Sequence, residues 1–159
     1  MGTIKYKSPI GVIFLAAKDG YITELYFEGG ITTPADIKEM PPSTSDEQVL
    51  AAFVKELDAY FSGELQEFTV PIKPVGTPFR VKVWEALRTI AYGETINYKQ
   101  LAERIGNPAA VRAVGGANHH NPISIIIPCH RVIGANGKLV GYGGGLHVKE
   151  FLLELEKKK

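Results

Sequence analysis

A short segment rich in proline and glycine, Pro74-Val75-Gly76, divides this chain into two parts with different hydrophobic patterns. Before it, two runs of β-branched and aromatic residues are joined by Asp19-Gly20, a dipeptide typical of hairpin turns. After it, apolar residues recur every three to four positions, the spacing of amphipathic helices. The sequence therefore predicts an α+β fold, with an N-terminal β-sheet lobe over 1–75 and a mainly helical lobe over 76–159.

Capping signals mark the expected helices in both lobes. In the first lobe a loop over 29–46 precedes a helix that we expect to start at the N-cap Ser45 and to end at Gly63. Another short strand is expected over 68–72. The second lobe opens on Thr77-Pro78, an N-cap followed by proline at the first helical position. The final helix is predicted from an apolar stripe made of Val148, Phe151, Leu152 and Leu155.

Two short helices in the second lobe are predicted to form a helix-turn-helix. Asn97 and Gln100 resemble a capping box at the start of the first, and Gly106 is a stop signal at its end. Asn107-Pro108 is expected to open the second helix at once. This second helix carries very small side chains and one arginine, Arg112, so its backbone can approach a nucleic-acid groove closely.

The tetrad Pro128-Cys129-His130-Arg131 contains the single cysteine of the chain and follows an expected strand over 123–127. A lone thiol beside an imidazole and a guanidinium has surroundings that favour a thiolate nucleophile. Because consecutive residues leaving a strand point in different directions, a water is a candidate bridge between Cys129 and His130. Glu156, at the edge of the apolar face of the last helix, is a candidate to orient the imidazole.

Two other interpretations of this pair stay open from the residues alone. Cys129 can be a small buried apolar residue and His130 a hydrogen-bonded core histidine. Cys129, His130 and the pair His119-His120 are also suitable metal ligands, but their spacing matches no common zinc pattern, so we expect no metal. We interpret His119-His120 as a polar pair at the surface or near phosphates.

Composition and charge restrict the classes of partner. The net charge is +1, yet residues 1–75 carry 6 basic and 11 acidic side chains, whereas residues 76–159 carry 12 basic and 6 acidic ones. This asymmetry suggests an anionic partner for the second lobe. No apolar run is long enough to span a bilayer, and the N-terminus lacks the pattern of a signal peptide. A single cysteine fits a reducing compartment, so we expect a cytoplasmic protein without a membrane partner.

The motifs assembled above resemble the O6-alkylguanine-DNA alkyltransferase family, whose members are also called methylated-DNA–protein-cysteine methyltransferases. The likeness is close over residues 76–156 and looser over the first lobe, for which it implies a ribonuclease-H-like fold. The motifs are Thr77-Pro78-Phe79, Val83-Trp84, Tyr92-Gly93-Glu94-Thr95, Arg112-Ala113-Val114-Gly115-Gly116-Ala117, Asn121-Pro122, Ile127-Pro128-Cys129-His130-Arg131-Val132, Gly141-Tyr142-Gly143-Gly144-Gly145-Leu146 and Lys149-Glu150-Phe151-Leu152-Leu153.

This resemblance implies a set of catalytic roles. Cys129 matches the alkyl acceptor, and His130 matches the histidine that activates it through a water. Glu156 matches the glutamate that orients the histidine. Asn121 matches the hinge asparagine between the recognition helix and the active-site segment. Tyr98 matches the tyrosine that rotates the 3′ phosphate and donates a proton towards the leaving guanine.

The resemblance also implies how DNA and the alkyl group are bound. Arg112 matches the arginine that enters the base stack in place of the flipped nucleotide. Small residues beside it let the helix approach the groove, and the other implied contacts line the alkyl pocket; they are Ala110, Ala113 and Gly115 on the helix, and Pro128, Tyr142, Gly143, Gly144 and Lys149 at the pocket. Some members hold zinc in the first lobe through cysteines; residues 1–75 here contain no cysteine or histidine, so no zinc or other cofactor is expected.

The predicted function is DNA repair by irreversible, single-turnover transfer of an alkyl group from O6-alkylguanine, and from O4-alkylthymine, in double-stranded DNA to Cys129. We expect a monomer that is consumed, because nothing in the chain can cleave a thioether. One alternative is a non-catalytic protein that only binds alkylated DNA, although such proteins replace the acceptor cysteine. Another is a cysteine hydrolase using Cys129, His130 and Glu156, which leaves the helix-turn-helix unexplained.

Overall fold

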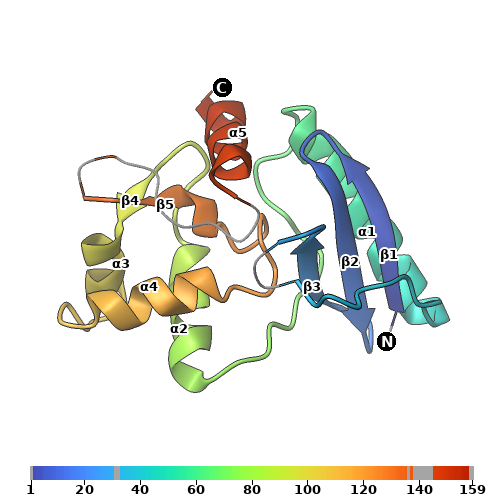
Figure 1. Cartoon of the computed structure of the whole chain (residues 1–159), viewed down its shortest axis with the longest axis horizontal. Helices are drawn as coiled ribbons and strands as arrows, with labels where there is room; N and C mark the ends of the chain where they lie inside the picture. Colours follow the sequence, from blue (N-terminus) through green and yellow to red (C-terminus); the bar gives the residue numbers. More distant parts are fainter. Residues whose placement is uncertain (1, 31–32, 136, 138–144, 158–159) are drawn as a thin grey trace.

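The computed structural model describes residues 2–30, 33–135, 137 and 145–157, and these form two lobes lying side by side (Figure 1). The N-terminal lobe is an antiparallel sheet with strand order β1-β2-β3, covered on one face by a long helix. Its elements are β1 (Gly2–Ser8), β2 (Gly11–Lys18), β3 (Tyr21–Phe27) and α1 (Thr44–Phe61). Asp19 and Gly20 both have positive φ, 53° and 81°, which confirms the predicted hairpin turn.

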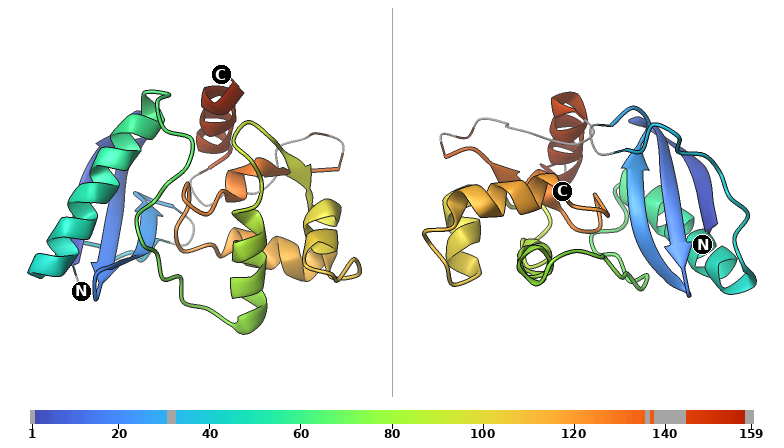
Figure 2. Two further views of the ribbon diagram at one scale, coloured as in Figure 1. Left: turned by 180° about the vertical axis from the view of Figure 1, so that it is seen from behind. Right: turned by 60° about the horizontal axis from the view of Figure 1, so that its bottom comes forward.

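The C-terminal lobe is mainly helical, which confirms the predicted α+β class. Helices α3 and α4 pack against each other and α2 lies beside them, while α5 stands at the junction with the first lobe (Figure 2). The elements are α2 (Pro78–Leu87), β4 (Ile96–Asn97), α3 (Tyr98–Arg104), α4 (Val111–His119), the 3-10 turn η1 (Cys129–Arg131), β5 (Val132–Ile133) and α5 (Leu146–Lys157). Strands β4 and β5 form a short parallel pair.

Local capping chemistry fixes most of the helix starts. Thr77 caps α2 through the backbone N–H of Arg80, and the reciprocal capping box of Asn97 and Gln100 is present at α3. The expected cap of α1 at Ser45 is wrong, because Ser43 is the extended residue whose side chain accepts from Asp46 N. Three consecutive hydroxyl residues are all good caps, so the sequence alone does not distinguish them.

Two other boundaries differ from the sequence-based expectation. Helix α4 begins at Val111 rather than directly at Asn107, because residues 107–110 first form a turn closed by Ala110 N donating to Asn107 O at 3.0 Å. The expected strand over 68–72 is reduced to an isolated bridge between Ile22 and Ile72. Over 107–110 a local hydrogen bond replaces the first helical turn, whereas the segment around Ile72 pairs with β3 only through Ile22.

The expected strand over 123–127 is a tight loop instead. Asn121 explains this, because its Nδ2 donates to Ile127 O at 2.7 Å and its Oδ1 accepts from Ile123 N at 3.0 Å. The loop is closed further by Ile127 N donating to Ile123 O at 3.0 Å. Ile125 has a φ of 78°, a left-handed conformation that costs a β-branched residue about 1–3 kcal/mol. The apolar run over 123–127 therefore contributes buried side chains to the core and does not form a strand.

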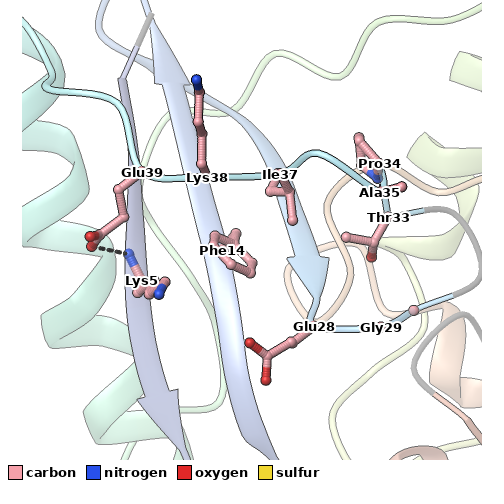
Figure 3. Close-up of a pocket in the computed structure, with 11 residues that line it drawn as sticks. Lys5, Phe14, Glu28, Gly29, Thr33, Pro34, Ala35, Ile37, Lys38 and Glu39 are labelled. Atoms are coloured by element: carbon pink, nitrogen blue, oxygen red, sulfur yellow. Dashed lines mark hydrogen bonds between the residues drawn. The ribbon is translucent and has the colours of Figure 1, made fainter.

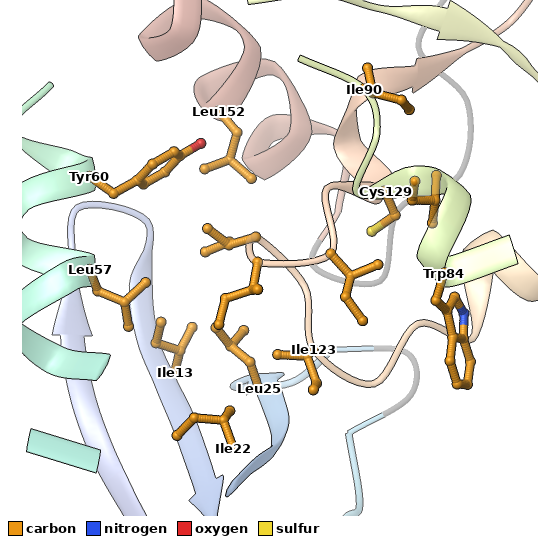
Figure 4. Close-up of a cluster of buried hydrophobic side chains, with 14 of the residues drawn as sticks. Ile13, Ile22, Leu25, Leu57, Tyr60, Trp84, Ile90, Ile123, Cys129 and Leu152 are labelled. Atoms are coloured by element: carbon orange, nitrogen blue, oxygen red, sulfur yellow. The ribbon is translucent and has the colours of Figure 1, made fainter. Parts of the chain in front are cut away.

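One apolar core extends across both lobes (Figure 4). The core includes Ile13 and Leu57 of the first lobe and Ile123 and Leu152 of the second, and all four side chains are fully buried. The edge of β3 also contacts the second lobe, since Leu25 N donates to Pro122 O at 2.8 Å. Within the described residues, no helix combines the length and the apolar character needed to cross a membrane.

Candidate active site

Cys129 is the first residue of η1 and is buried, with 5% of its surface exposed. Its backbone N–H donates to Ile127 O at 2.8 Å, so the loop held by Asn121 also fixes the cysteine. The Sγ atom lies 4.0 Å from Ser124 Oγ. Figure 4 shows Cys129 in the same apolar cluster as Trp84 and Ile123. The thiol is therefore held in a largely apolar setting with few polar neighbours.

Burial raises the pKa of the Cys129 thiol, against the expectation that its neighbours favour a thiolate. Hydrogen bonds from Asn121 and Ser124 and the positive charge of Lys149 act in the opposite direction, but burial outweighs them. The resting form is thus the protonated thiol. A nucleophilic reaction at this atom requires a base that removes the proton as the reaction occurs.

His130 and Glu156 form the hydrogen-bonded pair that the sequence predicted. His130 is fully buried, and its Nε2 lies 2.7 Å from Glu156 Oε2. Burial alone would raise the pKa of Glu156, but hydrogen bonds and charges from His130 and Arg131 lower it to about 2. Because this carboxylate is ionised, Nε2 carries the proton that it donates, and Nδ1 is left with its lone pair. No described residue bonds to Nδ1, which makes it the free basic atom of the ring.

The imidazole is neutral at physiological pH. Burial lowers the pKa of His130, and the charges of Arg131 and Lys149 lower it further, against the opposing effect of Glu156. A neutral imidazole with a fixed tautomer is the form that can accept a proton. The pair is therefore prepared as an oriented general base.

Arg131 and Tyr60, which the sequence did not assign to the site, also donate hydrogen bonds to Glu156. Arg131 donates from Nε to Oε1 at 2.8 Å and from Nη2 to Oε2 at 3.1 Å. Tyr60 donates its hydroxyl to Oε2 at 2.6 Å. Arg131 has a sequence signal in its place within the tetrad. Tyr60 has none, because it lies in the other lobe, 96 residues away along the chain.

Lys149 brings a cation close to the thiol. Its side chain is fully buried and Nζ donates to Val132 O at 2.6 Å. Burial lowers the pKa of Lys149 to about 8, while the nearby Cys129 raises it. The amine is therefore still mainly protonated at neutral pH. Lys149 and Glu156 are seven residues apart, so α5 directs both from the same face.

Tyr98 and Asn121 approach the cysteine from opposite ends of the helix-turn-helix. Tyr98 is the first residue of α3, and burial together with the charge of Cys129 raises the pKa of its phenol, while a hydrogen bond with Asn118 lowers it. The phenol therefore keeps its proton and can act as a donor. Asn121 follows α4 and contacts Cys129 as well as the loop backbone. The structure brings these two predicted residues to the site.

The expected DNA-contacting residues lie along α4. Arg112 and Ala113 are exposed, and Ala110 and Gly115 are partly buried. A Cβ at Gly115 would lie 3.9 Å from the Tyr98 ring, whereas a Cβ at Gly116 would meet nothing within 4 Å. The outer face of α4 is thus almost free of side-chain bulk around one arginine.

The remaining predicted positions fall into three groups. Pro128 is buried and lines a hollow between the lobes together with Tyr92 and Arg131. Tyr142, Gly143 and Gly144 lie outside the described residues. His119 and His120 meet edge to face, with centroids 5.7 Å apart, and the ring Nδ1 of His120 lies 2.8 Å from Gly116 O.

Two further features concern the part of the chain that the structure describes. Among those residues, no group of three or more histidine, cysteine, aspartate or glutamate side chains could hold a metal ion. A separate hollow lies over the N-terminal sheet, between Phe14 and the segment 33–39, with Lys5 and Glu28 at its rim (Figure 3). It includes none of the residues around Cys129.

Two family profiles match the chain. The profile of the 6-O-methylguanine DNA methyltransferase ribonuclease-like domain covers residues 2–74, and that of the 6-O-methylguanine DNA methyltransferase DNA binding domain covers residues 78–158. Together they account for nearly all of the sequence.

Similar proteins match this chain over nearly its full length. The methylated-DNA–protein-cysteine methyltransferase of Mycobacterium leprae is 50% identical over 150 residues, which is 94% of this chain and 88% of that protein. The protein of the same name from Methanosarcina acetivorans is 50% identical over 152 residues, 95% of either chain. The crystal structure of Mycobacterium tuberculosis OGT in complex with DNA is 49% identical, with a TM-score of 0.86 over 97% of this chain and 91% of that one.

Proposed function

The chain belongs to the methylated-DNA–protein-cysteine methyltransferase family, and from this premise we propose which of its residues carry out the reaction. It is a DNA-binding repair enzyme that transfers an alkyl group to a cysteine. We propose that Cys129, its single cysteine, is the acceptor. The observation that carries the proposal is the 2.7 Å contact of His130 Nε2 with an ionised Glu156, which leaves Nδ1 as a buried base next to the cysteine in the chain.

In the proposed reaction, the Cys129 thiol loses its proton to His130 Nδ1 through a bridging water. The sulfur attacks the alkyl carbon of O6-alkylguanine as the bond between that carbon and O6 breaks, and the bonding electron pair stays on the guanine. The Tyr98 phenol donates a proton to the departing base, whose negative charge would otherwise make it a poor leaving group. The proton held by His130 then returns through solvent to the Tyr98 phenolate, so overall the proton released by the thiol balances the one gained by guanine.

Lys149, Asn121 and Pro128 have supporting roles in this proposal. The Lys149 ammonium stabilises the negative charge that develops on sulfur, which matters most in a site of low dielectric. Asn121 holds the loop that presents Cys129. Pro128 and the segment containing Tyr142, Gly143 and Gly144 are proposed to bound the alkyl pocket.

We further propose that α4 enters a groove of double-stranded DNA and that the damaged nucleotide is flipped into the site. Flipping costs a few kcal/mol, and Arg112 offsets part of this by occupying the vacated space in the stack. The bare face of α4 lets its backbone lie close to the phosphates. A monomer with a support lobe over 1–75 and a DNA-binding, alkyl-transfer domain over 76–159 is sufficient for these steps, and O4-alkylthymine is proposed as a second substrate.

The thioether product makes the reaction irreversible. Attack by sulfur forms a carbon–sulfur bond that none of the described residues is arranged to cleave, so each molecule should act once. The presence of cysteine at the acceptor position argues against the alternative of a protein that binds alkylated DNA without reacting.

Intact-protein mass spectrometry with a duplex containing O6-methylguanine tests the proposal. We expect a gain of one methyl group that stops at one equivalent, and no gain in Cys129→Ser, which should still bind the duplex. Binding without any adduct on the unmodified chain would refute alkyl transfer. An adduct on Cys129→Ser would refute the assignment of the acceptor.

A further inference from the structure

We propose that Tyr60, on α1 of the N-terminal lobe, is a positioning residue for alkyl transfer: its hydroxyl holds Glu156 in the orientation that directs His130 towards Cys129. This inference rests on the proposed function of the site. It assigns to the N-terminal lobe a part in the chemistry beyond supporting the fold.

The geometry places Tyr60 and His130 on the same oxygen atom. Glu156 Oε2 accepts from Tyr60 Oη at 2.6 Å, from His130 Nε2 at 2.7 Å and from Arg131 Nη2 at 3.1 Å. Distances of this size are typical of hydrogen bonds strengthened by a charged acceptor. Because the two short bonds share one oxygen, a change in one alters the strength and direction of the other.

The Tyr60 ring is held firmly enough to serve as such a support. It is fully buried and contacts three aromatic rings, with centroid distances of 5.4 Å to Phe61, 5.5 Å to Phe68 and 6.3 Å to Tyr92. Figure 4 shows the ring extending from α1 towards α5, where Leu152 lies. The hydroxyl therefore meets the carboxylate at a position fixed by the packing of the first lobe.

Arg131 contacts both oxygens of Glu156, but its two bonds differ in length. Its strong bond, from Nε at 2.8 Å, is to Oε1, which is the oxygen that does not contact His130. Tyr60 approaches the other oxygen from a different element. On Oε2 the Tyr60 bond, at 2.6 Å, is shorter than the Arg131 bond, at 3.1 Å, so Tyr60 adds a support at the oxygen that orients the imidazole.

Tyr60 also moderates how strongly Glu156 attracts a proton on His130. A carboxylate oxygen that accepts an O–H bond is less basic towards its other partner. The charged and titratable groups facing this pair are Arg131 of η1, Lys149 of α5 and Tyr92 from the segment after α2, and Cys129 precedes His130 in the chain. With these unchanged, loss of the Tyr60 hydroxyl should raise the pKa of His130, so that the neutral base is lost at a higher pH.

Comparison of Tyr60→Phe with Tyr6→Phe is the matched test. Tyr6 also donates its hydroxyl to a carboxylate, Asp58 Oδ1 at 2.5 Å, but it does so within the first lobe. The rate constant for methyl transfer from an O6-methylguanine duplex is measured from pH 5 to 9 under single-turnover conditions. Tyr60→Phe should be slower by about tenfold, as expected for one hydrogen bond to a charged group, and its acid limb should move to higher pH.

The control defines what would overturn the inference. Tyr6→Phe should keep the wild-type pH profile and a rate within about twofold of wild type, since its hydroxyl touches no residue of the site. If both variants lose rate equally with unmoved profiles, or if Tyr60→Phe matches wild type, Tyr60 does not position Glu156. A wild-type protein that transfers no methyl group would instead refute the proposed function itself.

A second variant keeps the test decisive if Tyr60→Phe folds poorly. Incorporation of 3-fluorotyrosine at position 60 preserves the ring and makes the hydroxyl a stronger donor. The acid limb should then move to lower pH, opposite to the shift in Tyr60→Phe. Loss of stability cannot produce shifts of opposite sign, so an unmoved limb in the fluorinated protein would overturn the proposal.

Discussion

The buried cluster around Glu156 and the exposed face of α4 are built in opposite ways. In the cluster, one carboxylate accepts from Tyr60, His130 and Arg131, and the side chains of all four residues are largely or fully buried. On α4, Arg112 and Gly116 are exposed, and a side chain added at Gly116 would meet no other atom. The hydrogen bonds of the cluster are formed without DNA, whereas the outer face of α4 is exposed.

Under the proposed function, this difference separates the residues of the chemistry from those of DNA recognition. The cluster holds a base in a fixed tautomer before any DNA is bound, so its contribution depends on internal packing and ionisation. The α4 face depends on how closely a backbone can approach a groove and on where one guanidinium can reach. Variants of the cluster should therefore alter reaction and stability together, and variants of α4 should alter binding with little loss of stability.

Removal of the charge at Glu156 should have the largest effect. Glu156→Gln leaves the buried guanidinium of Arg131 without its counter-charge, which should cost about 3–5 kcal/mol in the free energy of unfolding. It also removes the orienting acceptor of His130, so the transfer rate should fall by roughly 10²–10⁴. Urea unfolding and single-turnover transfer measure the two effects.

Glu154→Gln is the control for this variant, because Glu154 lies on the same helix but its side chain is 61% exposed in a long pair with Lys157. We expect changes near zero in both measurements. Equal effects at positions 154 and 156 would show that helix α5, and not the buried cluster, is being perturbed.

The acid dependence of stability should reveal the same cluster. The pKa of Glu156 falls from its ordinary value of 4.5 to about 2 on folding, so its stabilisation is present above pH 4.5 and is lost as the pH falls towards 2. The loss should be on the order of 3 kcal/mol. Burial also lowers the pKa of His130, so its contribution starts to fall below its ordinary value of 6.5.

Urea unfolding from pH 7 to pH 3 checks this dependence. Wild type should lose stability steadily as the pH decreases, and Glu156→Gln should lose less of it below pH 4.5, because it lacks the titrating carboxylate. Parallel curves for the two proteins would mean that other carboxylates account for the acid sensitivity.

The smallest effects are expected on α4, where stability and affinity for duplex DNA should change in opposite directions. Gly116→Ala replaces a poor helix former inside α4 where the added Cβ has open space, so stability should rise by about 0.5–1 kcal/mol. The same methyl group lies on the surface that we propose to face DNA, so affinity for duplex should fall. Thermal unfolding and a fluorescence binding titration give the two signs, and an unchanged affinity would place the DNA elsewhere.

The sequence predicted the two-lobe fold and much of the buried cluster. Capping chemistry is local, so Thr77 and the pair Asn97 and Gln100 identified helix starts correctly. The strand prediction over 123–127 was wrong. The β-branched residues there favour a strand, but the side chain of Asn121 bonds to the backbone and closes a loop. Periodicity cannot anticipate a side chain that replaces strand hydrogen bonds.

The tetrad identified His130, the last helix and the family resemblance identified Glu156, and the structure brings the two side chains together. Tyr60 was not predictable in this way, because its hydrogen bond to Glu156 joins residues 96 positions apart on different lobes. The raised pKa of the Cys129 thiol was also missed, since burial depends on packing that a neighbouring-residue argument does not include. Long-range contacts and burial are what the structure adds.

One measurement tests the separation of chemistry from recognition most directly. Methyl transfer from an O6-methylguanine duplex is compared with benzyl transfer from the free base O6-benzylguanine, whose benzylic carbon is activated for displacement, in wild type, Arg112→Ala and Glu156→Gln. Arg112→Ala should lose about 10- to 100-fold with duplex, because flipping is less well supported, and stay within about twofold of wild type with the free base. Glu156→Gln should lose both reactions. Equal losses with the two substrates in Arg112→Ala would contradict the account.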